Sequence, residues 1–311
     1  MFTYNDIIYV GSSKPLICRD GNSQYARSMD LNFITYDELR WMDSKSLYFI
    51  IDISAGWTTS EDMDIIEEFV DRIPSKRMSI RLVDQFEHQR DADVYLRMAK
   101  MSIDYCIPVI GTYDVDYYDL DVGLVLPYPY LEEDEIKLTG SSVRKISSTI
   151  LTGANVKGIY PMREKLYSIS SNSERIDAIN HPGYSGKGWS NGVIGKDYLN
   201  MLSKYVFMVC TTCNESYELL KYIECAEAGC IPMGEIPNSL KGTEAEKYFI
   251  EIPDEALTSS KSFDKWFLDS INNTDYYRCS ISYRNYIRSI RNKGLLKDKL
   301  LNYINKRYGN F

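Results

Sequence analysis

Residues 221–237 read KYIECAEAGCIPMGEIP and join a helical pattern to an apolar strand pattern. Lys221 and Glu224 stand three positions apart, so they share one face of a helix at a separation of about 5–6 Å. Gly229 ends that helix, and an apolar strand is predicted at 230–233. Two interpretations are open. The two charges form a surface ion pair, or the ammonium binds a phosphate while the carboxylate binds sugar hydroxyls.

The stretch belongs to a run of alternating strand and helix patterns in the second half of the chain. Strands are predicted at 145–151, 205–210 and 230–233, and helices at 161–168, 197–203, 218–228, 263–271 and 287–304. Pro161 suits the first turn of its helix. Such alternation is typical of a parallel sheet covered by helices on both faces.

The first half of the chain shows the same alternation. Strands are predicted at 7–10, 47–53, 78–83 and 105–110, and helices at 60–72 and 94–101. Between the halves lie the acidic segments 114–121 and 131–135, with the stiff Pro127-Tyr128-Pro129-Tyr130 between them. The sequence therefore predicts an α/β protein with an N-terminal domain at 1–130, a second domain at 131–285 and a basic C-terminal helix at 286–311 that packs back across the domain junction.

Length and composition limit the class of protein. A chain of 311 residues suggests two domains, and a net charge of −8 argues against a general nucleic-acid coat. Positive charge gathers at 283–308, with eight basic residues against Asp298 alone. That helix could touch an anionic acceptor or pack on the acidic body, and the second is favoured.

The cysteines and the apolar runs bear on compartment and on metal. The seven cysteines are odd in number and sit mostly in apolar contexts, which favours free thiols in a reducing cytoplasm. Cys210 and Cys213 form a C-x-x-C, but no second such pair exists and the chain has two histidines, so a zinc site is disfavoured. No secretory signal or membrane span is apparent, and a cytoplasmic protein is expected.

Several residues stand where parallel sheets bind ligands, at the carboxyl ends of strands. Gly153 follows the strand at 145–151 and lets a backbone approach a phosphate. Arg163 lies in the first turn of the next helix, where it is either a solvent-exposed helix residue or a ligand of a nearby anion. An anion would explain why its cation opposes the helix dipole. His181 and Tyr184 lie in a turn-rich loop that could flank a base or a sugar, although a surface turn is the simpler interpretation.

The order of these features over 146–237 resembles the donor-binding half of a GT-B glycosyltransferase, in the group-1-like or spore-maturation-type branch. The matching features are Gly153, Tyr160-Pro161-Met162-Arg163, His181-Pro182-Gly183-Tyr184, Lys221-Tyr222-Ile223-Glu224 and Ala228-Gly229-Cys230-Ile231-Pro232. The resemblance implies two Rossmann-like domains facing across a cleft. It also implies that Lys221 pairs with the diphosphate of a nucleotide sugar and that Glu224 accepts hydrogen bonds from its ribose. The donor-binding residues would be Gly153, Arg163, His181, Tyr184, Lys221, Glu224 and Gly229.

One departure from the family pattern bears on mechanism. Many retaining members carry a second glutamate eight positions before the one matched by Glu224, and this chain has Ser216 there. An inverting single displacement is favoured, with a general base from the first domain. Asp84 and His88 are the candidates, with Asp20 as a rival. Arg163 and Lys221 would stabilise the leaving diphosphate, so neither metal nor cofactor is expected.

The function that follows is transfer of a hexosyl or pentosyl group from a nucleotide diphosphate donor to an acceptor hydroxyl. Three alternatives stay open. One is a metal-dependent GT-A glycosyltransferase that uses Asp114 and Asp116, although Asp-x-Asp occurs four times here. Another is a non-catalytic protein that senses a nucleotide or sugar. The third concerns the acceptor, which could be a modified DNA base in place of a glycan or small molecule.

Overall fold

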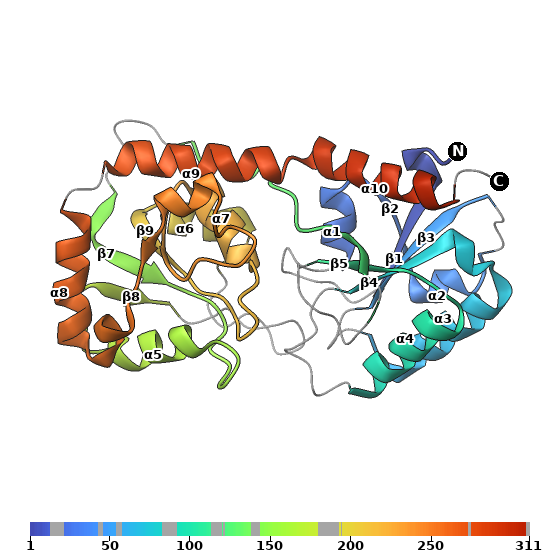
Figure 1. The fold of residues 1–311 in the computed structure, drawn as a ribbon, viewed down its shortest axis with the longest axis horizontal. Helices are drawn as coiled ribbons and strands as arrows, with labels where there is room; N and C mark the ends of the chain where they lie inside the picture. Colours follow the sequence, from blue (N-terminus) through green and yellow to red (C-terminus); the bar gives the residue numbers. More distant parts are fainter. Residues whose placement is uncertain are drawn as a thin grey trace. The chain divides into compact units, whose positions relative to one another are not determined.

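The computed structural model describes residues 1–12, 22–42, 46–53, 58–82, 92–112, 120, 122–137, 144–179, 193, 195–272 and 275–308. The chain divides into two compact units (Figure 1). Unit 1 comprises Met1–Pro129 and Arg291–Phe311, and unit 2 comprises Tyr130–Ile290. Unit 1 is therefore built from two segments that are distant in the sequence.

Unit 1 contains a six-stranded sheet in the order β2-β1-β3-β4-β5-β6, in which all paired strands are parallel. The strands are β1 (Ile7–Gly11), β2 (Asn32–Thr35), β3 (Tyr48–Ile53), β4 (Met78–Leu82), β5 (Val109–Gly111) and β6 (Val122–Val125). The helices are α1 (Asn22–Ser28), α2 (Tyr36–Leu39), α3 (Ser60–Arg72), α4 (Ala92–Asp104) and α10 (Lys293–Tyr308), with short 3-10 helices at Tyr4–Asp6 and Ser75–Arg77.

The sheet of unit 1 is buried as its apolar sequence predicts. Every residue of β1, β3 and β4 is buried, which is the pattern of a parallel sheet covered on both faces. α3 begins where predicted because Thr59 and Asp62 form a capping box at its first turn. Its apolar face packs on the sheet, where the rings of Phe69 and Phe49 meet edge to face at 4.9 Å.

A buried ion pair joins two strands of this sheet. Arg81 on β4 donates to Asp52 on β3 at 2.7 Å, and both side chains are fully buried. Tyr9 also contributes its hydroxyl to Asp52, and the guanidinium carbon of Arg81 lies 3.6 Å from the ring centroid of Tyr25. Asp52 and Arg81 stand directly opposite each other in the β3–β4 register, so their pairing fixes that register inside an otherwise apolar core.

Two expectations for unit 1 are wrong in detail. Residues 105–106 form a turn and the strand begins only at Val109, because Cys106 adopts a left-handed conformation with φ of 53°. The predicted linker also contains β6, which pairs with β5. Within the described residues, the sequence patterns missed the short elements α1, α2, β2 and β6 of this unit.

Unit 2 contains a five-stranded sheet in the order β11-β10-β9-β7-β8, again with parallel pairing throughout. The strands are β7 (Lys145–Leu151), β8 (Ile176–Ala178), β9 (Tyr205–Cys210), β10 (Ile231–Gly234) and β11 (Ile250–Glu251). The helices are α5 (Pro161–Ser170), α6 (Gly195–Leu202), α7 (Leu220–Ala228), α8 (Ser260–Ile271) and α9 (Tyr276–Ile290), with 3-10 helices at Glu244–Tyr248 and Asp254–Thr258.

The strand order of unit 2 reverses at β7. The chain leaves β7 for β8 on one side and returns to β9 on the other, so β7 and β9 flank a topological switch point. Ligands of open parallel sheets bind at such a point, beyond the carboxyl ends of the strands. Thr152 and Gly153 follow β7 there, and Thr211 and Thr212 follow β9.

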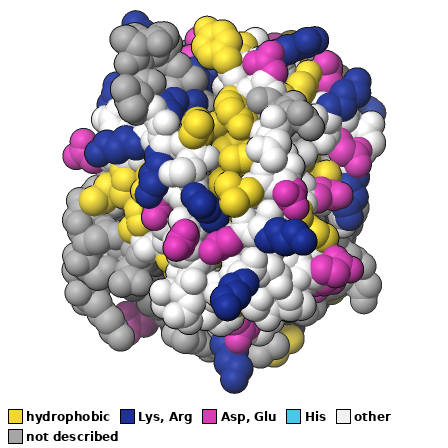
Figure 2. All heavy atoms as spheres, turned by 90° about the vertical axis from the view of Figure 1, so that its left-hand side faces the viewer, with side chains coloured by type: hydrophobic (Ala, Val, Ile, Leu, Met, Phe, Trp, Pro, Cys, Tyr) yellow, Lys and Arg dark blue, Asp and Glu magenta, His cyan; other side chains and the backbone are white. Residues whose placement is uncertain are grey.

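The α8 side of unit 2 presents a mixed surface. Figure 2 faces this side and shows hydrophobic side chains near its centre, flanked by basic and acidic ones. Leu268 on α8 and Tyr277 on α9 are among the exposed apolar residues of the unit. Beneath the surface, Phe263 and Phe267 of α8 are fully buried in the core of unit 2.

The single closing helix predicted at 287–304 is wrong. The structure has two helices there, with α9 ending at Ile290 in unit 2 and α10 beginning at Lys293 in unit 1. Lys293 and Lys297 of α10 pair with Asp30 of unit 1. Packing of this basic segment on the acidic body is thus seen within unit 1, whereas its packing across the domain junction stays a prediction.

The basic residues of α9 bind the start of unit 2. Arg284 and Arg288 both pair with Glu135. Arg284 also donates to the carbonyls of Ala226 and Glu227, in the last turn of α7. A cation at a helix C-terminus is stabilising, so this contact joins α9 to α7.

Candidate functional site

Two cations converge on Gly153 at the carboxyl end of β7. Gly153 adopts a φ of +108°, and a Cβ placed on it would overlap the end of the Lys221 side chain. The same point lies 2.9 Å from Nζ of Lys221 and 3.0 Å from Nη1 of Arg163. Only glycine fits this position, because it lacks the Cβ and tolerates the positive φ. Two positive charges that converge at the carboxyl end of a strand make a site suited to an anion.

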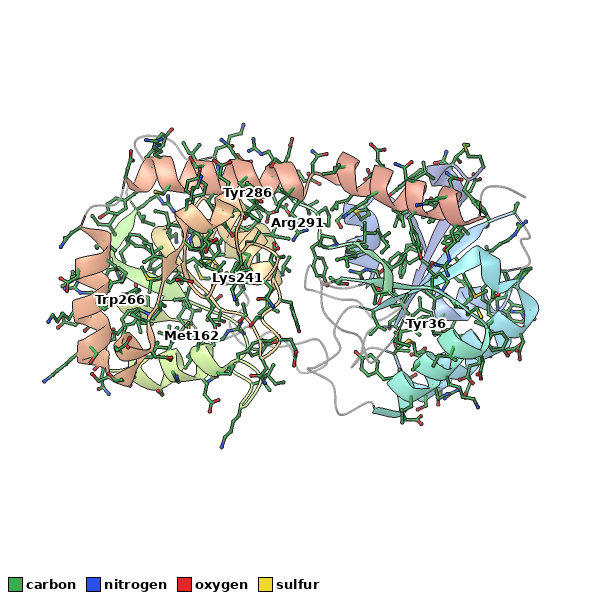
Figure 3. The ribbon with its side chains drawn as sticks, in the orientation of Figure 1. Tyr36, Met162, Lys241, Trp266, Tyr286 and Arg291 are labelled. Carbon is green, nitrogen blue, oxygen red and sulfur yellow. The ribbon has the colours of Figure 1, made fainter. Side chains whose placement is uncertain are left out.

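Arg163 is positioned by α5 and by the end of β9. Its side chain is 2% exposed, although it lies in the first turn of a helix. Nε donates to Thr211 Oγ1 at 3.0 Å, Nη1 donates to the carbonyl of Ala154 at 2.8 Å, and the guanidinium carbon lies 4.0 Å from the ring centroid of Tyr160. Its neighbour on α5, Met162, packs against the core of unit 2 and is labelled in Figure 3. Arg163 is therefore a fixed, inward-facing cation.

Lys221 reaches the same point from the first turn of α7. Its ammonium donates to Thr152 Oγ1 at 2.6 Å and to the Tyr198 hydroxyl at 3.4 Å. Burial lowers the pKa of Lys221 to about 8, with the nearby Arg163 cation acting in the same direction and the Glu224 carboxylate opposing both. The ammonium is thus a partly desolvated charge that gains from an added anion.

Glu224 lies one turn further along α7. Its charge acts on both Lys221 and Tyr198, raising the pKa of each side chain. The hydrogen bonds of the Lys221 ammonium nevertheless go to Thr152 and Tyr198, so Lys221 and Glu224 are more than an exposed surface pair. Lys221 and Glu224 present opposite charges along one helix face, a spacing that suits a ligand with an anionic end and neutral hydroxyls.

The first turn of α7 adds backbone donors. Its N-cap residue, Leu219, provides no side-chain hydrogen bond to cap the helix. The N–H groups of this turn and the positive end of the helix dipole therefore favour an anion. Ser216 shortly before the helix has a φ of +56°, an uncommon conformation for a residue other than glycine.

The predicted site residues are distributed as follows. The structure brings Gly153, Arg163, Lys221 and Glu224 together, while Gly229 lies at the far end of α7, where its left-handed conformation (φ 69°) ends the helix. The predicted residues outside the described part of the chain are Asp84, His88, His181 and Tyr184, together with the alternatives Asp20, Asp114 and Asp116.

Sequence reasoning missed the hydroxyl-bearing members of the site and Glu235. Thr152, Thr211 and Tyr198 contact the two cations directly. Glu235, which follows β10, accepts a hydrogen bond from the Thr212 amide at 2.8 Å, and burial raises its pKa. Thr152, Thr211 and Glu235 follow strands of one parallel sheet, so the rule that ligands bind at strand ends could have found them, whereas no local pattern singled out Tyr198.

The described residues contain neither a cluster of metal ligands nor a membrane-spanning helix. They contain no group of three or more His, Cys, Asp or Glu side chains arranged to hold a metal ion. Among the helices in this part of the chain, none is both long enough and apolar enough to cross a membrane.

Comparison with known proteins gives a likeness in structure alone. No protein-family model matches the sequence, and neither does any curated protein. The structure is similar to that of the pneumococcal O-GlcNAc transferase GtfA in complex with UDP and GlcNAc, with a TM-score of 0.53, 11% sequence identity and 88% of this chain covered. This chain spans 59% of the length of that one.

A second solved structure that resembles this chain, at a lower TM-score, is that of the glycotransferase of kitacinnamycin. Its TM-score is 0.43 at 9% identity, covering 96% of this chain and 98% of that one. The likeness to the pneumococcal enzyme shows the fold: the chain is a mixed α/β protein with two parallel sheets, folded like a glycosyltransferase.

Proposed function

We propose that the protein is a glycosyltransferase of the GT-B class that takes its sugar from a nucleotide diphosphate donor. The observation that carries the proposal is the convergence of Lys221 and Arg163 on Gly153, at the switch point of the unit 2 sheet. A diphosphate carries two adjacent negative charges, and two fixed cations beside uncapped helix amides suit it. Similarity of fold to a glycosyltransferase seen with UDP supports the same assignment.

Each described site residue has a role in this proposal. Arg163 and Lys221 bind the diphosphate, Gly153 admits it to the backbone, and Glu224 accepts hydrogen bonds from the ribose hydroxyls. In the transition state negative charge builds on the leaving diphosphate, and the two cations stabilise it without a metal ion. The pneumococcal structure contains UDP, so uridine diphosphate sugars come first among the donors to test.

The proposed reaction is a single displacement with inversion. The acceptor oxygen attacks the anomeric carbon while a general base removes its proton, and the bond to the diphosphate oxygen breaks. Asp84 or His88 of the N-terminal domain is the proposed base. The acceptor is a hydroxyl on a glycan or a small molecule, and a modified DNA base is the alternative that a steep salt dependence of acceptor binding would favour.

The test is a panel of nucleotide diphosphate sugars measured by thermal shift and by calorimetry, with EDTA and with Mn²⁺. A donor at 100 times its dissociation constant stabilises the fold by about 2.7 kcal/mol. We expect one donor to bind equally well in EDTA, and Arg163→Lys and Glu224→Ala to lose most of that stabilisation. Lys241→Ala, a substitution in the same unit at an exposed residue labelled in Figure 3, is the control and should bind as the unchanged protein does.

Three outcomes would change the assignment. Donor binding that persists in both Arg163→Lys and Glu224→Ala would show that these residues do not form the donor site. Binding and turnover that require Mn²⁺ would favour the GT-A alternative with Asp114 and Asp116. Binding of a donor without hydrolysis or transfer to any acceptor would favour a sensing protein.

A further inference from the structure

Two hydroxyl groups surround the ammonium of Lys221. Thr152 Oγ1 lies 2.6 Å from Nζ and the Tyr198 hydroxyl lies 3.4 Å from it. The two hydroxyl oxygens are themselves 2.6 Å apart, so the three polar atoms form a closed triangle. The members come from three elements, since Thr152 follows β7, Tyr198 lies on α6 and Lys221 lies on α7.

The hydrogen bonds of the triangle restrict the conformation of the Lys221 side chain. Lys221 runs across Gly153, where the absence of a Cβ makes room for its last carbon. Nζ also lies 6.0 Å from the ring centroid of Tyr198, within the range of a cation–π attraction. A lysine side chain free in solvent would lose about 2 kcal/mol of rotamer entropy on binding a ligand, and a side chain held beforehand avoids most of that loss.

We propose that Thr152 and Tyr198 are positioning residues that hold the Lys221 ammonium beside Gly153, ready for the diphosphate of the donor. This inference rests on the proposed function. The two hydroxyls do not touch the reacting atoms. They act through Lys221, by fixing where its charge stands and by favouring its protonated form.

The charged and titratable groups that face the ammonium set what the hydroxyls must achieve. Glu224 on α7 favours the charged form, Arg163 on α5 and burial oppose it, and Cys210 on β9 faces it as well. Tyr198 stays protonated because burial and the Glu224 charge raise its pKa well above the usual range. The Tyr198 oxygen can therefore accept a hydrogen bond from the ammonium while its O–H donates to Thr152 Oγ1, and this arrangement favours the charged lysine.

The first test measures the protonation of Lys221 without any ligand. Trace acetylation across a pH series, read by mass spectrometry at Lys221, gives the pH at which half of the ammonium has lost its proton. We expect this midpoint to fall by about half a unit, a threefold change in the protonation equilibrium, in Tyr198→Phe and in Thr152→Val. Tyr198→Phe removes the hydroxyl, and Thr152→Val replaces the hydroxyl with a methyl group, so both substitutions keep the shape of the side chain.

Tyr167→Phe is the matched control. Its hydroxyl donates to the carbonyls of Gly153 and Ile179, at 3.1 and 3.0 Å, so it supports the same loop without touching the ammonium. We expect its midpoint to equal that of the unchanged protein. Equal midpoints in all four proteins would overturn the inference, and so would a shift in Tyr167→Phe as large as that in Tyr198→Phe.

The second test links the midpoint to the donor. A UDP-sugar serves as the probe because it lacks the terminal phosphate monoester whose pKa is about 6. Its affinity, measured by calorimetry, should fall as pH rises past the Lys221 midpoint, and at a lower pH in Tyr198→Phe and Thr152→Val. If the affinity for the UDP-sugar fell at the same pH in the unchanged protein, Tyr198→Phe and Thr152→Val, the positioning role would be wrong.

The two proposals fail separately. If no nucleotide sugar binds the unchanged protein, the proposed function is wrong, whereas the acetylation midpoints still decide whether Thr152 and Tyr198 hold the ammonium. If a donor binds and the midpoints do not move, the site stands and the positioning role is wrong.

Discussion

The candidate site depends on the missing side chain of Gly153. It holds a φ of +108° at the end of β7, and Lys221 and Arg163 occupy the space beside it. Gly158 follows five residues later in a similar backbone region, with a φ of +78°, but nothing lies within 4 Å of where its Cβ would stand. Substitutions at the two glycines therefore distinguish the effect of backbone strain, which both share, from the effect of a collision with the cations, which occurs only at Gly153.

Gly153→Ala should lose donor binding by more than tenfold, because the new methyl group displaces both cations. It should also destabilise the fold by about 1–3 kcal/mol, from the positive φ and the collision. Gly158→Ala should show only the strain part of the destabilisation and keep its affinity. Calorimetry and denaturant unfolding measure the two quantities, and equal losses of affinity in both variants would contradict this account.

The buried ammonium of Lys221 lowers the stability of the fold near neutral pH. Its pKa in the fold, about 8, is below the value of 10.5 of an unperturbed lysine, so its charged form is penalised by folding. The penalty is present below pH 8. Above that pH the folded protein binds fewer protons than the unfolded chain, so stability rises as pH increases toward 10.5.

Lys221→Met should therefore be more stable than the unchanged protein near pH 7, by about 1–2 kcal/mol after allowance for partial exposure. That advantage should fade as pH rises toward 10.5, while nucleotide-sugar binding is lost at every pH. Denaturant unfolding at a series of pH values measures the difference. A variant that is less stable at pH 7 would show that the ammonium is well satisfied as it stands.

The charged residues Lys221, Glu224 and Arg163 of the candidate site could be predicted from local patterns, whereas Tyr198 could not and Thr152 could be found only from its place at a strand end. Lys221 and Glu224 are recognisable because their spacing on a helix is fixed by helix geometry, and Arg163 because it opposes a helix dipole. Thr152 and Tyr198 are polar residues of common types, and they meet only because α6 packs beside α7 and β7. Their proximity is a property of the tertiary fold.

At the scale of elements, the pairing of β3 with β4 depends on a charge inside the core. Asp52 and Arg81 oppose each other in the register, both fully buried. Removing one partner leaves the other charge uncompensated in an apolar setting, whereas replacing both by apolar residues of similar volume removes the cost.

Asp52→Leu alone and Arg81→Met alone should each destabilise the protein by about 3–5 kcal/mol, the range for breaking a buried ion pair. The double substitution Asp52→Leu with Arg81→Met should recover most of that loss. Thermal and denaturant unfolding give the comparison in a double-mutant cycle. Additive losses in the double variant would mean that the two charges do not depend on each other.

Elements with strong signals were predicted well, and those set by backbone detail were not. The structure has α3 at the residues predicted, because an apolar face and the capping residues Thr59 and Asp62 agree. β8 and β11 were missed, since strands of two or three residues leave no period to detect. The break between α9 and α10 was also missed, because helical periodicity continues through Arg291 and Asn292 without a proline.

At the scale of the whole molecule, α10 belongs to unit 1 although it comes last in the sequence. Leu296, Leu300 and Ile304 are buried along one stripe of α10. Asn305 exchanges hydrogen bonds with the backbone of Phe2, at 2.7 and 3.0 Å. Unit 2, by contrast, is one continuous segment from Tyr130 to Ile290.

Deleting 291–311 should therefore damage unit 1, although the deleted segment adjoins unit 2 in the sequence. We expect unit 1 to lose protection against hydrogen exchange in β1 and β3 while β7 and β9 stay protected. A fragment of residues 130–290 should fold and keep nucleotide-sugar affinity. Uniform loss of protection in both units, or a fragment that fails to fold, would show that the units depend on each other.

The split of unit 1 between the two ends of the chain also sets an order of events during synthesis. A ribosome releases residues 1–129 first, but their sheet lacks its last covering helix until the final segment emerges. Unit 2 can complete its fold earlier, since its whole sequence emerges before residues 291–311 do. A nascent chain stalled with residues 291–311 still inside the ribosome, and Ile290 outside it, should then bind nucleotide sugar while its amino-terminal sheet is still open to proteases and chaperones.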